Sequence, residues 1–141
     1  MLNNFDQKIA HCLKQHGLRA TRHRICVLSV LEKASVPMSH VALMQAIADP
    51  GFDRVTLYRV LNALKEVGLI HQVQGSDGVW RFCAHESDAG ICPGGHPHLL
   101  CEVCGGMQCL TGQKLPHIEV PSDFEVHHKQ MLITGVCHKC R

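Results

Sequence analysis

Two Cys-x-x-Cys pairs are the residues of this 141-residue chain whose spacing points most directly to chemistry. The first pair is Cys101 and Cys104, the second is Cys137 and Cys140, and 32 residues lie between the pairs. Each pair can present two sulfur atoms on one tight turn, and the intervening chain is long enough to bring the turns together. The spacing predicts a structural four-cysteine zinc site, with two disulfides or a redox pair as the alternative.

A second group of candidate ligands consists of His71, Cys83, His96 and His98. The two later histidines alternate along an extended segment, so both can face one ion only if the backbone bends or the ligands reach from adjacent positions. Cys83 supplies a soft anion. An ion held by this group would restrict how the two halves of the chain lie relative to one another. For His71, a partly exposed strand residue without a ligand role is the alternative.

The charge distribution marks the N-terminal half as the part that could meet a polyanion. Residues 1–83 contain ten lysines and arginines against six acidic residues, a net charge of +4. Residues 84–141 contain four against six, a net charge of −2. A basic half is a candidate for nucleic-acid binding. An ordinary solvated surface is the alternative, because the imbalance is modest.

Apolar periodicity and capping residues predict four helices in the first half. The first has an apolar stripe at Phe5, Ile9, Cys12 and Leu13 and ends at Gly17. The second is capped by Thr21 and runs to about residue 33, and the third is capped by Ser39 and stops before residue 49. The fourth covers residues 54–67. Cys12 and Cys26 fall in the apolar pattern and are interpreted as small core residues.

The fourth helix is the candidate for DNA recognition. It turns Leu57, Val60, Leu61 and Leu64 toward a core and carries Arg54, Tyr58, Arg59, Asn62 and Lys65 on its other faces. Such side chains can donate hydrogen bonds to phosphates and base edges, although a solvated amphipathic helix shows the same pattern. Strand-like runs follow at residues 69–74 and 79–83, joined by a Gly-Ser-Asp-Gly turn. Helices, a recognition helix and a hairpin are the order of a winged helix.

Length and composition divide the chain into two small domains. We expect an α+β fold with a winged helix-turn-helix DNA-binding domain at residues 1–83, a linker at residues 84–95 and a small α/β dimerisation domain with a structural zinc site at residues 96–141. A domain of about 50 residues buries too little apolar surface to be stable alone, so a structural metal has a clear use. An odd number of cysteines and the absence of an apolar signal core indicate a reducing cytoplasm.

Over nearly its whole length the chain resembles the ferric uptake regulator (Fur) family of bacterial metal-dependent repressors. The resemblance rests on GLRATRHR at residues 17–24, VTLYRVL at residues 55–61 and HPHLLCEVC at residues 96–104. It implies a homodimer that binds a double-stranded DNA operator and a hinge metal site that couples the two domains. It also implies DNA contacts from Arg19 near the minor groove and from Tyr58 and Arg59 in the recognition helix, beside which we place Arg54 and Thr56. His23 replaces the usual proline of the early motif.

The ligand types bear on which metal is sensed. Iron and manganese sensors of the family generally place carboxylates in the hinge site, whereas this chain has Cys83 and Cys109 at the corresponding positions. Sulfur with imidazole favours zinc. The set His71, Cys83, His96 and His98 resembles that of the family's zinc sensors, and Cys109 is a rival fourth ligand or an exchanging fifth. The function expected is a zinc-responsive repressor of metal-uptake genes, with an iron-, manganese- or redox-responsive regulator as the alternative.

Several positions depart from the family pattern. Pro37 stands where iron and peroxide sensors carry a histidine, which argues against peroxide sensing by histidine oxidation. Gly95, Pro97 and Lys129 match the ligands of a further family site, which is expected to be absent. Pro116 interrupts residues 111–121, where the family runs a longer helix. Cys92 is expected to be a mobile, exposed thiol, with an auxiliary metal or redox role as the alternative. His127 and His128 are expected to be solvated.

Two other classes of function fit less well. A zinc hydrolase or deaminase would need an open metal position and a general base, and the chain has neither His-Glu-x-x-His nor His-x-Glu paired with Pro-Cys-x-x-Cys. The chain is therefore not expected to be an enzyme. A zinc-ribbon interaction module would explain the C-terminal cysteines but not the recognition helix or the second ligand group.

Overall fold

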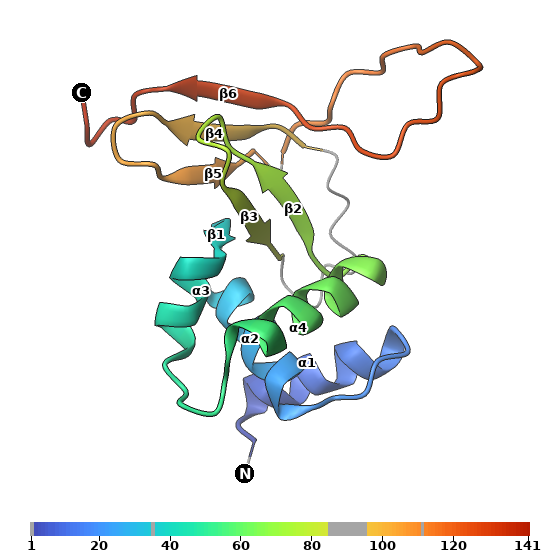
Figure 1. The fold of residues 1–141 in the computed structure, drawn as a ribbon, viewed down its shortest axis with the longest axis vertical. Coiled ribbons are helices and arrows are strands. Elements are labelled where there is room, and N and C mark those ends of the chain that lie inside the picture. The colour runs from blue at the N-terminus through green and yellow to red at the C-terminus, as the bar shows by residue number, and fades with distance from the viewer. Residues whose placement is uncertain (1, 35, 85–95, 111) are drawn as a thin grey trace. The chain divides into compact units, whose positions relative to one another are not determined.

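The chain is described in a computed structural model over residues 2–34, 36–84, 96–110 and 112–141. It divides into two compact units, residues 1–92 and 93–141 (Figure 1). Within the described ranges the elements are helices and strands together, so the chain is α+β. The expected linker, with Cys92 and Gly95, lies outside these ranges after Ala84, so the limits 1–83, 84–95 and 96–141 stay predictions. None of the described helices has the length and apolar character needed to cross a membrane.

The first two helices begin and end at the expected signals. In α1 (Asn4–Gln15) the Asn3 side chain accepts the Asp6 backbone N–H at 2.8 Å, and Gly17 follows the helix in a left-handed conformation at φ +78°. In α2 (Arg22–Ala34) the Thr21 side chain accepts the Arg24 backbone N–H at 3.3 Å. The predicted Thr21 cap is therefore confirmed. In the same helix, His23 packs its ring edge-on against Phe52, with 4.9 Å between ring centroids.

One of the two cysteines assigned to the core is not buried. Cys12 is 3% exposed, as expected. Cys26 is only half-buried, because it lies one turn from Arg22 and from half-buried Val30 at the border of the apolar face. Partial burial raises the pKa of its thiol. The prediction of a core position was wrong for Cys26.

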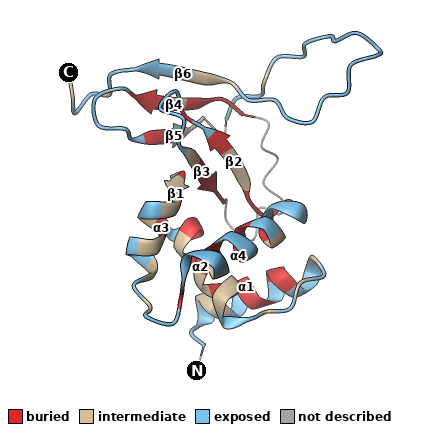
Figure 2. Ribbon diagram, viewed as in Figure 1, coloured by how far each residue is buried: buried red, intermediate tan, exposed pale blue. Residues whose placement is uncertain are grey.

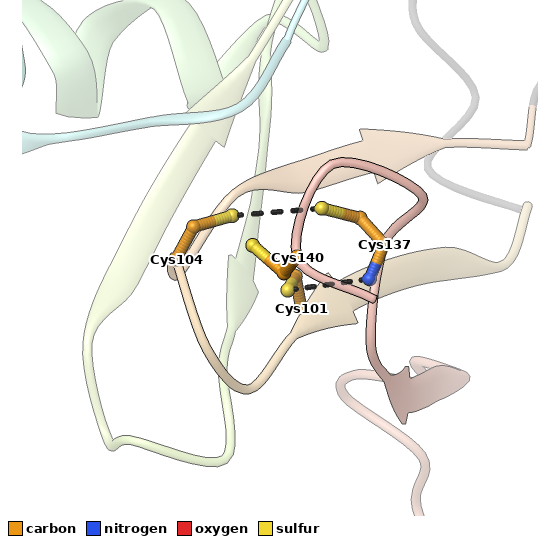
Figure 3. Close-up of side chains that lie close together, drawn as sticks. All are labelled: Cys101, Cys104, Cys137 and Cys140. Atoms are coloured by element: carbon orange, nitrogen blue, oxygen red, sulfur yellow. Dashed lines mark hydrogen bonds between the residues drawn. The ribbon is translucent and has the colours of Figure 1, made fainter.

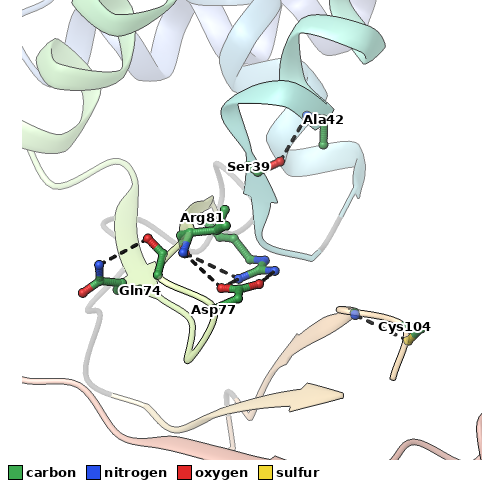
Figure 4. Close-up of polar contacts among 9 residues, drawn as sticks. Ser39, Ala42, Gln74, Asp77, Arg81 and Cys104 are labelled. Carbon is green, nitrogen blue, oxygen red and sulfur yellow. Dashed lines mark hydrogen bonds and ion pairs between the residues drawn. The ribbon is translucent and has the colours of Figure 1, made fainter. Parts of the chain in front are cut away.

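The third helix is tied to a strand that the sequence did not predict. Strand β1 (Met38–Ser39) pairs antiparallel with a later strand, and α3 (His40–Ile47) begins directly after it. The Ser39 side chain caps α3 by accepting the Ala42 backbone N–H at 3.1 Å (Figure 4). A strand of two residues is too short to show alternation, so the periodicity of the sequence could not reveal it.

The fourth helix, α4 (Arg54–Glu66), presents one apolar face and one exposed face. Asp53 caps it by accepting the Thr56 backbone N–H at 2.7 Å. The residues predicted to face inward are all buried: Leu57, Val60, Leu61 and Leu64. They join the core formed by the other helices, in which Ile9, Leu13, Val27, Leu28, Leu31 and Leu43 are buried (Figure 2). Helix packing therefore holds α4 with its polar face outward.

The predicted hairpin consists of β2 (His71–Gln74) and β3 (Trp80–Cys83). It is antiparallel, and β1 adds to the other edge of β3, so that the order is β1-β3-β2. Leu69 and Ile70 were expected in the strand but belong to the helical core instead. The connecting turn uses Gly78 at φ +78°, a conformation that side chains with a Cβ rarely adopt.

An ion pair fixes the turn of this hairpin. The Arg81 guanidinium donates to the two Asp77 carboxylate oxygens at 2.8 and 3.2 Å, and the Val79 backbone N–H donates to Asp77 at 3.0 Å (Figure 4). The hydrogen bonds from Arg81 lower the pKa of Asp77 to about 2. The guanidinium is 10% exposed and the carboxylate 43% exposed. The turn is therefore held by a bidentate contact between residues four apart.

Replacing Asp77 with asparagine is expected to lower the free energy of unfolding of the full chain by about 0.5–1 kcal/mol, a value limited by solvent screening of the exposed carboxylate. Because the pKa of Asp77 is depressed, its contribution is present above the ordinary carboxylate pKa and is lost as the pH falls toward about 2. Chemical unfolding at neutral pH measures the difference. Glu66→Gln, at an exposed residue ending α4, is the matched control, and an equal loss in both variants would contradict the assignment.

The second unit contains a three-stranded sheet. Its strands are β4 (His98–Cys101), β5 (Met107–Cys109) and β6 (Leu132–Gly135), in the order β5-β4-β6. Strand β5 is antiparallel to β4, and β6 is parallel to it. Leu100 and Met107 are the large apolar side chains buried in the described part of this unit.

The expected α/β character of the second unit is not found. Its described residues contain strands and no helix, and residues 112–131 run without helix or strand as a long excursion before β6 (Figure 1). Pro116 and Pro121 lie within this excursion, and each removes a backbone donor and disfavours a helical conformation in the preceding residue. His127 and His128 lie here and are exposed, as expected.

Candidate functional site

The sulfur atoms of Cys101, Cys104, Cys137 and Cys140 gather at one end of the second unit (Figure 3). They all lie within 4.8 Å of one another, and the Cys104 and Cys137 sulfurs are 3.9 Å apart. A tetrahedral site with zinc–sulfur bonds of about 2.3 Å has sulfur–sulfur separations of about 3.8 Å. The cysteines of the described ranges are free thiols, so the disulfide alternative is not seen there.

The strand pairing explains why these sulfurs meet. Because β4 and β6 are parallel and Cys101 is opposite Gly135, the two Cys-x-x-Cys turns leave neighbouring strands at the same end. The first turn closes with the Gly105 backbone N–H donating to the Cys101 carbonyl at 2.9 Å, and Gly105 has φ +73°. The second closes with the Cys140 backbone N–H donating to the Cys137 carbonyl at 3.0 Å. Sequence spacing alone could not show that the strands are parallel.

The backbone donates hydrogen bonds to the sulfur atoms of Cys101 and Cys104. The Cys137 backbone N–H donates to the Cys101 sulfur at 3.4 Å, and the Gly106 N–H donates to the Cys104 sulfur at 3.4 Å. Backbone hydrogen bonds, those from Cys104 and Cys137 foremost, lower the pKa of Cys101 to about 6. Hydrogen bonding with Cys137 raises the pKa of Cys140 to about 12. Four thiolates this close need a cation, and the donor set fits a soft, tetrahedral one.

The second ligand group is divided between the two units. In the first unit, His71 and Cys83 are directly opposite one another across the β2–β3 hairpin. Side chains at opposite positions of an antiparallel pair have Cβ atoms about 4.5–5.5 Å apart, so both can reach one ion. Cys83 is 1% exposed and His71 is half-buried. The hairpin therefore offers one imidazole and one thiol from adjacent strands.

In the second unit, His96 and His98 bring their rings together, with 4.6 Å between centroids. The expectation that the backbone must bend for both histidines to face one ion was wrong, because side chains two residues apart on an extended segment lie on the same face. Both histidines are buried. Cys109 is opposite His98 in the β4–β5 pairing, which adds a thiol beside these imidazoles. This half of the group thus has three candidate ligands, two on one small sheet and His96 just before it.

The candidate DNA-contacting residues are concentrated on α4. Arg54, Tyr58 and Arg59 are exposed and Thr56 is half-buried, all within the first two turns of the helix. Tyr58 is 47% exposed although it is aromatic, and Val55 beside it is 57% exposed. Exposed donors with one aromatic ring and one apolar side chain suit contacts to phosphates, base edges and thymine methyl groups.

Arg19 lies apart from that helix, in the exposed segment that joins α1 to α2. Its carbonyl oxygen accepts a hydrogen bond from the Arg24 guanidinium at 3.0 Å, which stiffens the segment. The described contacts do not bring Arg19 together with the α4 residues. Its role at DNA therefore rests on the sequence resemblance.

Sequence reasoning missed three features next to these residues: the Asp53 cap of α4, the Asp77–Arg81 ion pair, and the contact of His40 with Tyr58. The sequence signal for the cap was an Asp directly before a segment with helical periodicity. The sequence signal for the ion pair was two opposite charges four residues apart. The His40 contact joins two helices and had no local signal.

The curated relatives include the peroxide-responsive repressor PerR of Staphylococcus aureus. It is 28% identical over 145 residues, which cover 99% of this chain and 93% of the relative.

Solved structures and a family profile were also compared. A zinc uptake regulator complexed with zinc and DNA has a TM-score of 0.67 at 21% identity, covering 99% of this chain and 96% of that chain. The Helicobacter pylori ferric uptake regulator Fur has a TM-score of 0.64 at 18% identity, covering 99% and 95%. At these identities the structures show the fold alone. The profile of the Ferric uptake regulator family matches residues 15–137, nearly the whole chain, and the protein therefore belongs to the ferric uptake regulator family.

Proposed function

We propose that this member of the family is a homodimeric, zinc-responsive repressor that binds operator DNA through a winged helix at α4 and the β2–β3 hairpin. Family membership makes it a metal-responsive transcriptional regulator and not an enzyme. The observation that carries the zinc proposal is the cross-strand pair His71 and Cys83 on the hairpin that follows α4. A metal bound by this pair would lie on the hairpin that follows the proposed recognition helix, which supports a link between metal binding and DNA recognition.

The donor atoms support zinc over the other metals of the family. Thiolate and imidazole together favour zinc, whereas carboxylate and water ligands suit manganese and imidazole with carboxylate suits iron(II). The candidate ligands in both units are cysteines and histidines. The regulatory site is therefore proposed to bind zinc through Cys83 and His71 from the hairpin and through His96 and His98 from the second unit.

Cys109 is proposed as a further member of that site. Its position opposite His98 gives it the same relation to a histidine that Cys83 has to His71. These five residues exceed the four ligands of a tetrahedral zinc site, so one position is shared, and His71 and Cys109 are the pair proposed to exchange there. The four C-terminal cysteines are proposed to bind a separate, structural zinc.

A peroxide-responsive regulator is the second candidate, because a curated relative carries that function. Pro37 is buried at the position where such sensors were expected to carry a histidine, and proline has no side-chain ligand. The experiment that separates the candidates is an operator titration with buffered zinc, iron(II) or manganese(II), before and after peroxide. Binding that follows zinc and survives peroxide supports the proposal, and binding that follows iron or manganese and is lost with peroxide contradicts it.

The dimer is proposed to form through the second unit. The side chains Ile118, Val120, Phe124, Val126, Ile133 and Val136 are large, apolar and exposed there. Strand β6 is also at an edge of its sheet, where backbone groups are open to pairing. Apolar exposure of this kind on a small unit is typical of an interface.

Arg59→Ala is expected to weaken operator binding by about 1–3 kcal/mol, the usual cost of losing an arginine contact to a base. Arg59 is exposed on α4, so neither the bound zinc nor the free energy of unfolding should change. Fluorescence titration of an operator duplex at a fixed salt concentration measures the loss. Lys8→Ala, an exposed lysine of α1, is the control for charge alone, and unchanged affinity in Arg59→Ala would place Arg59 off the DNA surface.

A further inference from the structure

Three rings from separate elements of the first unit meet at the start of α3. The His40 ring lies against the Tyr58 ring of α4, with 4.2 Å between centroids and 35° between planes. Its other neighbour is the Phe82 ring of β3, which it meets edge-on at 4.9 Å and 81°. His40 thus contacts the exposed face of the proposed recognition helix on one side and the hairpin on the other.

The backbone fixes where the His40 ring lies. Met38 pairs with Phe82 across β1 and β3, and the Ser39 cap starts α3 at the next residue. The Nε2 atom of His40 is buried with no hydrogen-bond partner in the described residues. Contacts with the two aromatic rings, rather than a hydrogen bond at Nε2, therefore orient the imidazole.

The surroundings of His40 favour the neutral form of its imidazole. Burial foremost, and then the positive charge of Arg54, lower the pKa of His40 below its ordinary value. His40 and Tyr58 line a cavity of about 520 Å³. Arg81 lines this cavity too, and the charge of Arg81 is balanced by Asp77. A neutral imidazole between two aromatic rings packs against both of them as a third ring.

This cluster connects two residues to which the proposed function gives separate tasks. Phe82 directly precedes Cys83, the proposed zinc ligand, and Tyr58 directly precedes Arg59, the proposed base contact. We propose that His40 couples zinc binding at Cys83 to the DNA-reading face of α4 through the Phe82–His40–Tyr58 ring contacts. The inference rests on the proposed function, and it adds the residue that transmits the regulation.

The physical reason is the close packing of these rings. Zinc bound to Cys83 fixes the end of β3 and with it the orientation of the Phe82 ring. Packed side chains do not deform continuously, so a change at Phe82 selects between discrete arrangements of its neighbours. His40 is the neighbour that also contacts Tyr58. If the ring is removed, zinc and DNA can each still bind, but each should affect the other less.

The test is the coupling factor, defined as the operator affinity with buffered zinc divided by that without zinc. His40→Ala is expected to lower this factor by about 2- to 30-fold, the range in which residues between coupled sites act. His40→Phe keeps an aromatic ring of similar shape and should keep the factor near that of the wild type. Val41→Ala is the matched control, because Val41 lines the same cavity but is 62% exposed and belongs to no ring contact of the cluster.

Bound zinc and the unfolding temperature of each full-length variant are measured alongside. A His40→Ala variant with the wild-type coupling factor overturns the inference. This includes a variant whose operator affinity falls by the same factor with and without zinc. A folded His40→Phe variant that loses the coupling also overturns it, and this outcome can be measured even if His40→Ala fails to fold. Wild-type protein whose operator binding ignores zinc would overturn the proposed function first, and the inference with it.

Discussion

Cys137→Ser is expected to remove one zinc per chain and to unfold the second unit, because this unit has little else to hold it together. Leu100 and Met107 are the large apolar side chains buried in its described part, and burying each stabilises by about 1.5–3 kcal/mol. A structural four-ligand zinc site contributes about 10–16 kcal/mol in small domains. Losing the Cys137 thiol breaks the site, because it removes the sulfur that lies 3.9 Å from the Cys104 sulfur.

The measurements are zinc per chain, the unfolding temperature and the mass of the protein in solution. We expect zinc to fall by one equivalent, the unfolding transition to broaden or vanish, and the dimer to be lost. Removing zinc from the wild type with a strong chelator should reproduce the effect. Cys26→Ser is the matched control, because Cys26 is half-buried in α2 and belongs to neither ligand group. A stable dimer of Cys137→Ser with undiminished zinc would contradict the assignment of the four cysteines as zinc ligands.

The helices of the first unit were predictable because their signals are local. Gly17, Thr21 and Ser39 mark helix ends or beginnings that the structure confirms within one or two residues. The inward face of α4 was also predictable, because four leucines and valines recur at helical spacing. These features depend on residues that are neighbours along the chain.

Features that depend on pairing between distant residues were not predictable. Strand β1 exists only because Met38 and Ser39 reach β3, and their own sequence carries no strand pattern. The parallel pairing of β4 with β6 joins residues more than 30 positions apart. The absence of a helix at residues 112–131 had local signals in Pro116 and Pro121, which indicate interruption but not the loss of the whole helix.

The sequence identifies the candidate ligand residues by their types. The structure shows which of them lie close together within each unit. Cys-x-x-Cys spacing identified the four cysteines, while the distances among the sulfurs depend on the fold of the β4–β6 sheet. Cys109 was left open by the sequence, and the β4–β5 register places it opposite His98. His40 went unremarked because its contacts with Tyr58 and Phe82 come from three separate elements.

Cys83→Ser is expected to abolish zinc-dependent DNA binding while leaving the fold and the structural zinc intact. Cys83 is buried at the end of β3, and serine is similar in size, so the hairpin should keep its register with His71. A serine hydroxyl is a far weaker ligand for zinc than a thiolate. The regulatory site should therefore lose its zinc, and one zinc per chain should remain at the four C-terminal cysteines.

Linkage makes the test quantitative. Zinc can favour the DNA-binding arrangement only by binding that arrangement more tightly, so DNA must raise zinc affinity by the same factor, commonly about 5–150-fold. Operator titrations of wild type and Cys83→Ser, each with and without buffered zinc, give that factor for both proteins. The wild type should show it and the variant should give a factor near one, while Cys26→Ser behaves as the wild type. A Cys83→Ser protein that still responds fully would show that the sensor lies elsewhere, and Cys109 and Cys92 would then be the residues to replace next.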